Sequence, residues 1–242
     1  MKQVAIYNNQ AFGDCLLGTH TASLYKQRFP DHNITFLVRE NLKATTSETE
    51  NQLEELIEVL ELQNGIDNVG IISHDGRIQS KHPITESFYK IIVQDKWFSD
   101  LGIVKSQSYE LLSDEHFSNT ETKFNVSKAK NLPTDRLVIV TCGPLDWNRK
   151  LSNETTRVNT LNSIINFLKN NNIRAEIKML GKDVDNMTML ESLECLNNAH
   201  LYIGPMGMYV HAAAGLGVDT IHITSVYPPE YDSPKFYHSG WH

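Results

Sequence analysis

Cysteine is scarce in this sequence and does not occur in a pattern that would build a disulfide framework or a zinc site. The three cysteines, Cys15, Cys142 and Cys195, are an odd number at wide spacing, without a Cys-x-x-Cys pair. Thiols of this kind are usually reduced in the cytoplasm, so we expect a cytoplasmic protein without disulfides.

Long apolar runs and clusters of basic residues are also absent. Residues 1–7 hold too short an apolar run for a signal peptide, and no run approaches the roughly 20 residues of a membrane span. We therefore expect no transmembrane segment. The formal net charge is −7, with 22 basic against 29 acidic residues. Because nucleic-acid binding depends on clustered lysine and arginine, we expect no nucleic-acid partner, although a helix start can still bind a small diphosphate.

Strand-like and helix-like segments alternate along most of the chain. Apolar, β-rich runs predict strands, and apolar residues at helical spacing predict helices. The strands are expected at 2–7, 34–38, 69–72, 137–141, 175–180, 201–203 and 220–224, and the helices at 16–28, 50–62, 87–101, 155–170, 187–197 and 209–216. This alternation predicts an α/β protein with parallel sheets and flanking helices.

The pattern is weakest between about residues 73 and 135, where we place a domain junction. Residues 106–134 are polar and lack sustained periodicity, and Pro133 then precedes the β-branched run that restarts the alternation. We predict two Rossmann-like domains, 1–132 and 133–242. Two such halves predict a cleft between them, in which a ligand binds at the carboxyl ends of the strands.

The stretch 202–217 has a layout that suits a phosphate group. A strand ends at Gly204, a loop containing Gly207 lets a ligand approach the backbone, and an alanine-rich helix follows. The start of that helix offers N–H groups and the positive end of a dipole. The alternative is an ordinary strand, loop and helix of any Rossmann-like half, in which His211 only packs or caps.

Together with the first forty residues, this stretch resembles glycosyltransferase family nine, the ADP-heptose:lipopolysaccharide heptosyltransferases and their relatives. The matching residues are Phe12-Gly13-Asp14, Tyr25 to Pro30, Val38-Arg39, Ile203-Gly204-Pro205, Gly207, His211 and Ala212-Ala213-Ala214. The resemblance implies the GT-B fold of two Rossmann-like lobes, either as a compact version without the family's usual C-terminal extension or as a degenerate one. Met206 stands at an acidic position of the family loop, and Met208 at a position that is commonly glycine.

The resemblance implies that Asp14 is the catalytic base and that Gly13 permits close approach of the acceptor. An inverting transfer requires such a carboxylate, because the acceptor hydroxyl has a pKa far above neutrality and must lose its proton as it attacks the sugar. The alternative is that Asp14 caps the first helix, since aspartate is a preferred N-cap residue. A cap can also act as a base if its second oxygen faces the cleft.

The donor site implied by the resemblance lies in the second half. The residues expected to bind the nucleotide sugar are Thr141, Arg149, Lys150, Lys182, Met206, Gly207, Met208 and His211. The helix start and these cations would neutralise the leaving diphosphate. The alternative is that Arg149 and Lys150 are solvated beside a loop that Trp147 anchors. No carboxylate pair has metal-ligand spacing, so we expect no metal and no cofactor besides the donor substrate.

These observations predict an inverting, metal-independent glycosyltransferase that moves a sugar from a nucleotide diphosphate sugar to a hydroxyl of a glycan, lipopolysaccharide-like or lipid-linked acceptor. The alternative from another class is a non-catalytic nucleotide-sugar or glycan-binding protein that keeps the GT-B cleft, and Met206 and Met208 motivate it. A nucleotide-sugar isomerase would act without an acceptor, but the acidic cluster that such chemistry requires does not occur.

Overall fold

The computed structural model of the 242-residue chain describes residues 2–8, 12–40, 52–73, 77–81, 88–94, 124–143, 154–181, 184, 186–205 and 207–223. The chain divides into two compact units, Met1–Asn125 and Val126–His242, which we call unit 1 and unit 2. Each unit is described by itself. A domain boundary after residue 132 stays a prediction.

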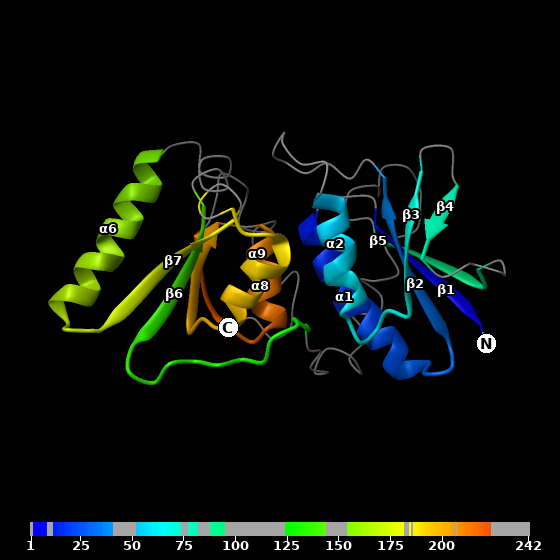
Figure 1. The fold of residues 1–242 in the computed structure, drawn as a ribbon, viewed down its shortest axis with the longest axis horizontal. Helices are drawn as coiled ribbons and strands as arrows, with labels where there is room; N and C mark the ends of the chain where they lie inside the picture. Colours follow the sequence, from blue (N-terminus) through cyan, green and yellow to red (C-terminus); the bar gives the residue numbers. More distant parts are fainter. Residues whose placement is uncertain are drawn as a thin grey trace. The chain divides into compact units, whose positions relative to one another are not determined.

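Unit 1 is built on a five-stranded sheet in the order β4-β3-β2-β1-β5. Its elements are β1 (Gln3–Asn8), α1 (Phe12–Arg28), β2 (Asn33–Arg39), α2 (Gln52–Glu61), β3 (Asn68–Ile72), β4 (Ile78–Ser80) and β5 (Lys90–Gln94). β1 pairs in parallel with β2 and β5, and β2 pairs in parallel with β3. The α1 and α2 helices lie on the same face of this sheet (Figure 1).

The pattern of apolar residues explains these elements. The five central residues of β2, 34–38, are all buried, as expected for a parallel strand that is covered on both faces. In α2, the buried residues Leu56, Val59 and Leu60 recur at helical spacing, so one side of the helix packs on the sheet. The parallel α/β organisation that the sequence predicts is therefore confirmed in this unit.

Three local predictions for unit 1 need correction. The helix expected over 87–101 is wrong, because Lys90–Gln94 forms β5 and extends the sheet beside β1; residues 95–101 lie outside the described residues. The run Ile91-Ile92-Val93 is β-branched, and this favours a strand over a helix. In addition, β4 pairs antiparallel with β3 at the sheet edge, and α1 begins at Phe12, four residues before the expected start at residue 16.

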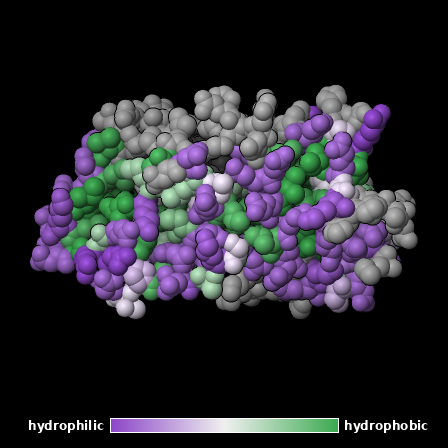
Figure 2. All heavy atoms as spheres, in the orientation of Figure 1, coloured by the Kyte–Doolittle hydropathy of each residue, from purple (hydrophilic) through white to green (hydrophobic). Residues whose placement is uncertain are grey.

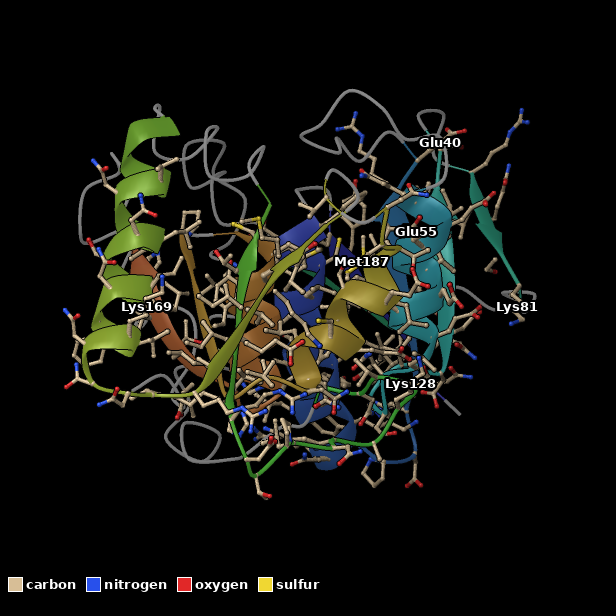
Figure 3. The ribbon with its side chains drawn as sticks, turned by 60° about the vertical axis from the view of Figure 1, so that its left-hand side comes forward. Glu40, Glu55, Lys81, Lys128, Lys169 and Met187 are labelled. Carbon is tan, nitrogen blue, oxygen red and sulfur yellow. The ribbon has the colours of Figure 1, made fainter. Side chains whose placement is uncertain are left out.

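Unit 2 is built on a four-stranded sheet in the order β7-β6-β8-β9, in which every described pair is parallel. Its elements are β6 (Leu137–Cys142), α6 (Glu154–Asn170), β7 (Ala175–Leu180), α8 (Met189–Asn197), β8 (Leu201–Pro205), α9 (Met208–Gly215) and β9 (Asp219–Ile223). The α6 helix covers one face of the sheet, and α8 and α9 cover the other (Figure 1). Lys169 lies near the C-terminal end of α6 (Figure 3).

The core of unit 2 joins α6 to the sheet. Ile139 of β6, Leu168 of α6 and Ile203 of β8 form a buried cluster. On the surface near α6, Figure 2 shows apolar residues among polar ones, and Phe167 and Val158 of this helix are 60% and 41% exposed. In the part of the chain that the structure describes, no helix has the length and apolar character needed to cross a bilayer.

Candidate functional site

The carboxyl ends of β6 and β8 lie side by side in unit 2. The two strands are in register, with Ile139 opposite Leu201 and Val140 opposite Tyr202. The chain leaves β6 toward α6 on one face of the sheet and leaves β8 toward α9 on the other face, so the two connections diverge (Figure 1). In open α/β sheets, ligands bind in the crevice at such a switch point.

The turn between β8 and α9 is open at the backbone. Gly207 is the N-cap of α9, with φ 168° and ψ −169°, and as a glycine it has no side chain to cap the helix. This is extended backbone, and among the described residues a Cβ at Gly207 would meet no atom within 4 Å. A ligand can therefore approach this turn closely, where the positive end of the α9 dipole favours an anion.

Gly204, a buried residue of β8 three positions before Gly207, has a packing role instead. The side chain of Tyr202 is only 1% exposed, and a Cβ at Gly204 would lie 2.7 Å from its Cζ atom. The Tyr202 ring also lies 6.4 Å from the Tyr209 ring, measured between centroids, and this contact joins β8 to α9. Glycine at 204 thus makes room for the tyrosine that supports the Gly207 turn.

The structure describes four of the eight donor-site residues predicted in the second half. Gly207 and Met208 are neighbours at the start of α9, and His211 follows one helical turn later; all three are half-buried. Thr141 lies near the carboxyl end of β6 and is 1% exposed. Its place at the same sheet edge is clear, but its contact with a phosphate stays a prediction.

The other four donor-site residues, Arg149, Lys150, Lys182 and Met206, lie outside the described residues. The sequence places Arg149 and Lys150 in the connection that follows β6, Lys182 directly after β7 and Met206 between β8 and α9. Each therefore comes after a strand of the sheet in the sequence. Their roles stay predictions.

In unit 1, the two predicted residues lie at the equivalent edge of the sheet. Gly13 and Asp14 are the second and third residues of α1, directly after β1, and Asp14 is half-buried. Asp14 is therefore inside the first turn and does not have the N-cap position that the alternative requires. A carboxylate in the first turn of a helix is stabilised by the helix dipole.

This edge is also a switch point. β1 has β2 on one side and β5 on the other, and the chain leaves β1 through α1 toward β2. Asn8, which is fully buried, ends β1 at this edge, and sequence reasoning missed it. A polar residue that closes an apolar strand is the signal that could have found it.

The charge of Asp14 affects the neighbouring thiol. Burial raises the pKa of Cys15 well above its ordinary value, and the negative charge of Asp14 raises it further. Cys15 is therefore a neutral, buried thiol and not a nucleophile. Asp14 itself carries a carboxylate, which can accept a proton.

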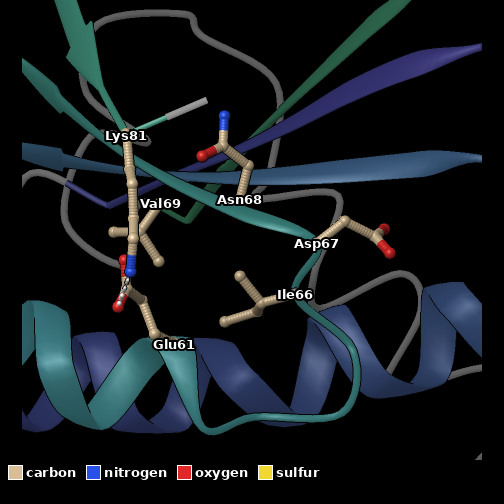
Figure 4. Close-up of a pocket in the computed structure, with 6 residues that line it drawn as sticks. All are labelled: Glu61, Ile66, Asp67, Asn68, Val69 and Lys81. Atoms are coloured by element: carbon tan, nitrogen blue, oxygen red, sulfur yellow. Dashed lines mark hydrogen bonds and ion pairs between the residues drawn. The ribbon is translucent and has the colours of Figure 1, made fainter. Parts of the chain in front are cut away.

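The small pocket in Figure 4 lies at the opposite edge of the unit 1 sheet. It has a volume of about 200 Å³ and is lined by Glu61, Ile66, Asp67, Asn68, Val69 and Lys81. Lys81 Nζ lies 3.1 Å from Glu61 Oε2, and the two side chains point toward one another (Figure 4). Since Asn68 begins β3, this pocket is at the amino ends of the strands, away from Asp14.

No group of three or more histidine, cysteine, aspartate or glutamate side chains is arranged to hold a metal ion within the described ranges. Each unit instead offers one feature among its described residues: unit 1 has the Asp14 carboxylate at the start of α1, and unit 2 has the helix N-terminus at the start of α9. The first can accept a proton, and the second can bind an anion.

No family model matches the sequence, and no curated protein matches it. The fold does match solved structures. A glycosyl transferase of family 9 from Veillonella parvula matches with a TM-score of 0.52 and 12% identity, over 100% of this chain and 84% of that chain. ADP-heptose lps heptosyltransferase II of E. coli matches with a TM-score of 0.57 and 12% identity, over 99% of this chain and 89% of that chain.

A third similar structure is TibC of enterotoxigenic E. coli, described as an iron-containing dodecameric glycosyltransferase. It matches with a TM-score of 0.57 and 11% identity, over 96% of this chain, which spans 62% of TibC. At such low identities the similarity is one of fold. The resemblance inferred from the sequence is therefore confirmed at this level: the chain has the α/β fold of the family 9 heptosyltransferases.

Proposed function

We propose that this protein is an inverting glycosyltransferase that uses a nucleotide diphosphate sugar. The observation that carries the proposal is the position of Asp14, in the first turn of the helix that follows β1, an interior strand of the sheet. The fold supports it, because the similar solved structures are glycosyl- and heptosyltransferases. A further similar structure is that of the E. coli heptosyltransferase WaaC with ADP, so a nucleoside diphosphate is the ligand class to test first.

The donor diphosphate binds at the start of α9. The open backbone at Gly207 lets phosphate oxygens approach, and the first turn of α9 supplies N–H groups and the positive end of its dipole. Arg149, Lys150 and Lys182 add positive charge from the neighbouring connections at the same edge. Because these groups neutralise the leaving diphosphate, we propose that transfer needs no metal ion.

The transfer is a single displacement. The carboxylate of Asp14 takes the proton from the acceptor hydroxyl while the hydroxyl oxygen forms a bond to the anomeric carbon. The bond from that carbon to the phosphate oxygen breaks, and its electron pair leaves with the nucleoside diphosphate. Attack opposite to the leaving group inverts the configuration of the anomeric carbon. The acceptor is a glycan or lipid-linked hydroxyl compound.

Replacement of Asp14 by asparagine tests the base. Asparagine has nearly the same shape but cannot take the proton, so we expect transfer to fall on the order of 10²- to 10⁴-fold while donor binding is unchanged. The matched control is Asp31→Asn, since Asp31 is exposed in the turn beyond the other end of α1. Transfer at the wild-type rate by Asp14→Asn would refute the assigned role.

Metal independence is tested by measuring transfer with and without a chelator. We expect the same rate after exhaustive treatment with EDTA, because the helix start and the cations carry the charge of the leaving group. A rate that is lost with EDTA and restored by one divalent metal would contradict this part of the proposal. The Asp14 assignment would stand independently.

The second candidate is a binding protein without catalysis. It is favoured by Met208, which the structure places in the first turn of α9, where a bulky side chain replaces the commonly small residue of the family. Calorimetric titration with ADP-, UDP- and GDP-sugars, together with an assay of donor hydrolysis, separates the two. Tight binding with neither transfer nor hydrolysis would favour the binding protein.

A further inference from the structure

The chain that leads from unit 1 into unit 2 is held firmly at its unit 1 end. Gln63, which is 3% exposed, donates from Nε2 to the carbonyl of Asn125 at 2.9 Å, and its Oε1 accepts from the Asn125 N–H at 2.9 Å. Asn125 Nδ2 also donates to the carbonyl of Leu62. Phe124, just before it, is 5% exposed. We call these contacts the first clamp.

The same segment is held again on unit 2 only two residues later. The Glu194 carboxylate of α8 accepts a hydrogen bond from Ser127 Oγ and pairs with Lys128 Nζ at 2.6 Å. Asn197 Nδ2 donates to the carbonyl of Lys128 at 3.1 Å. Lys128 lies in this connecting segment and is labelled in Figure 3. These contacts, all within unit 2, form the second clamp.

Bonds to the buried Glu194 carboxylate make the second clamp strong. The Glu194 side chain is 8% exposed, whereas that of Lys128 is 71% exposed. A buried carboxylate without partners is costly, and hydrogen bonds to a charged group are stronger than those between neutral groups. Farther along, the N–H of Asn131 donates to Asn198 Oδ1 at 2.6 Å and continues the attachment to unit 2.

Between the two clamps lies a single residue, Val126. Each residue of a chain has only two soft backbone dihedral angles. The first clamp holds the N–H and carbonyl of Asn125, and the second holds the hydroxyl of Ser127 and the carbonyl of Lys128, so both clamps restrict the chain beside Val126. We propose that Val126 is the pivot of this connection: rotation of one unit against the other through residues 124–131 takes place at Val126, and Gln63 and Glu194 confine it there. This inference is independent of the proposed chemistry.

Spin labels on the two units test the pivot in the full chain. Glu58 of α2 and Lys169 of α6 are exposed, and each can be replaced by a labelled cysteine in a Cys195→Ser background, since the other native cysteines are buried. The distribution of distances between the labels is measured by double electron–electron resonance. Its width reports how far one unit turns against the other.

We expect Val126→Gly to broaden the distribution, because glycine enlarges the range of φ and ψ at the pivot. Val126→Pro should narrow it, since proline fixes φ. Neither change touches a clamp, so melting temperatures should stay close to that of the parent. Gln63→Ala and Glu194→Ala should each broaden the distribution, because opening a clamp frees further residues. Glu191→Gln, on the same helix, is the control and should leave the width unchanged.

A distribution that keeps its width in Val126→Gly would overturn the proposal. It would also be overturned if opening either clamp had no effect on the width, because rotation would then occur elsewhere. Hydrogen exchange provides a second measure that does not depend on labels. The amide of Asn125 should exchange slowly in the wild type and rapidly in Gln63→Ala, while the amide of Asn131 stays protected in both.

Discussion

Replacement of Gly207 by alanine separates ligand binding from stability at the candidate site. The added Cβ would meet no atom of the described part of the chain within 4 Å, and the backbone at this position is extended, a conformation that alanine adopts without strain. The methyl group would instead occupy the space through which a phosphate approaches the start of α9. The change therefore affects the bound state far more than the fold.

The two effects on stability oppose each other and are small. Replacing glycine by alanine where the backbone permits it stabilises a protein by about 0.4–1 kcal/mol through the unfolded chain. Alanine is a poorer N-cap than glycine, at a cost of roughly 0.5–1 kcal/mol. We therefore expect a change within about 0.5 kcal/mol. Loss of one or two hydrogen bonds to a charged phosphate costs about 1.5–3 kcal/mol, or roughly 10- to 150-fold in Kd.

The assay is calorimetric titration of wild type and Gly207→Ala with ADP, UDP and GDP, after thermal melting has shown that both are folded. The control is Gly217→Asn at the other end of α9, where φ is +62°, a conformation that asparagine tolerates. We expect the control to bind like the wild type. If wild type binds a nucleotide diphosphate and Gly207→Ala binds it equally well, the diphosphate is not at this turn.

Two further predictions concern stability. Gly204→Ala should destabilise the protein by about 1–3 kcal/mol, because the new Cβ would overlap the buried Tyr202 ring. A melting temperature equal to that of wild type would contradict this packing role of Gly204. Burial raises the pKa of Glu194, but hydrogen bonds from Lys128 and Ser127 lower it more, and the net shift is downward. The ionised carboxylate therefore adds stability above its ordinary pKa of about 4.3, which is lost as pH falls through its lowered folded value. The melting temperature of wild type should exceed that of Glu194→Gln near neutral pH. If this difference in melting temperature were equally large at about pH 2, the stabilising role of the ionised Glu194 carboxylate would be refuted.

Much of the fold could be predicted from the spacing of apolar residues along the sequence, because in most helices and strands these are the residues that the structure buries. The β2 run 34–38 is buried throughout, and α2 buries the residues that share one helical face. The helix predicted over 87–101 was wrong because β5 is a short strand, and a short strand carries too little local pattern to be told from a helix. The β-branched residues of β5 are a short run, and their pairing with β1 joins segments more than eighty residues apart.

The candidate site could be predicted only in part. The role of Asp14 was predicted from the resemblance to family nine, and that of Gly207 from its place before a helix start and from the same resemblance; both residues follow parallel strands, whose carboxyl ends share one edge of each sheet. The burial of Thr141 and the packing role of Gly204 could not be predicted, since both depend on side chains from other elements. The Tyr202 ring, not a ligand, requires glycine at 204, although the sequence motif gives both glycines the same appearance.

The two units share a topology in which predicted site residues follow the first strand of each unit. In each sheet the first strand of the unit, β1 or β6, has neighbours on both sides, so the connection that follows it opens at a switch point. After β1 that connection leads to the carboxylate of Asp14, whereas after β6 the sequence supplies Arg149 and Lys150. A carboxylate can take a proton from an acceptor but repels a diphosphate, whereas cations attract a diphosphate. These opposite charges are the reason that we propose the acceptor for unit 1 and the donor for unit 2.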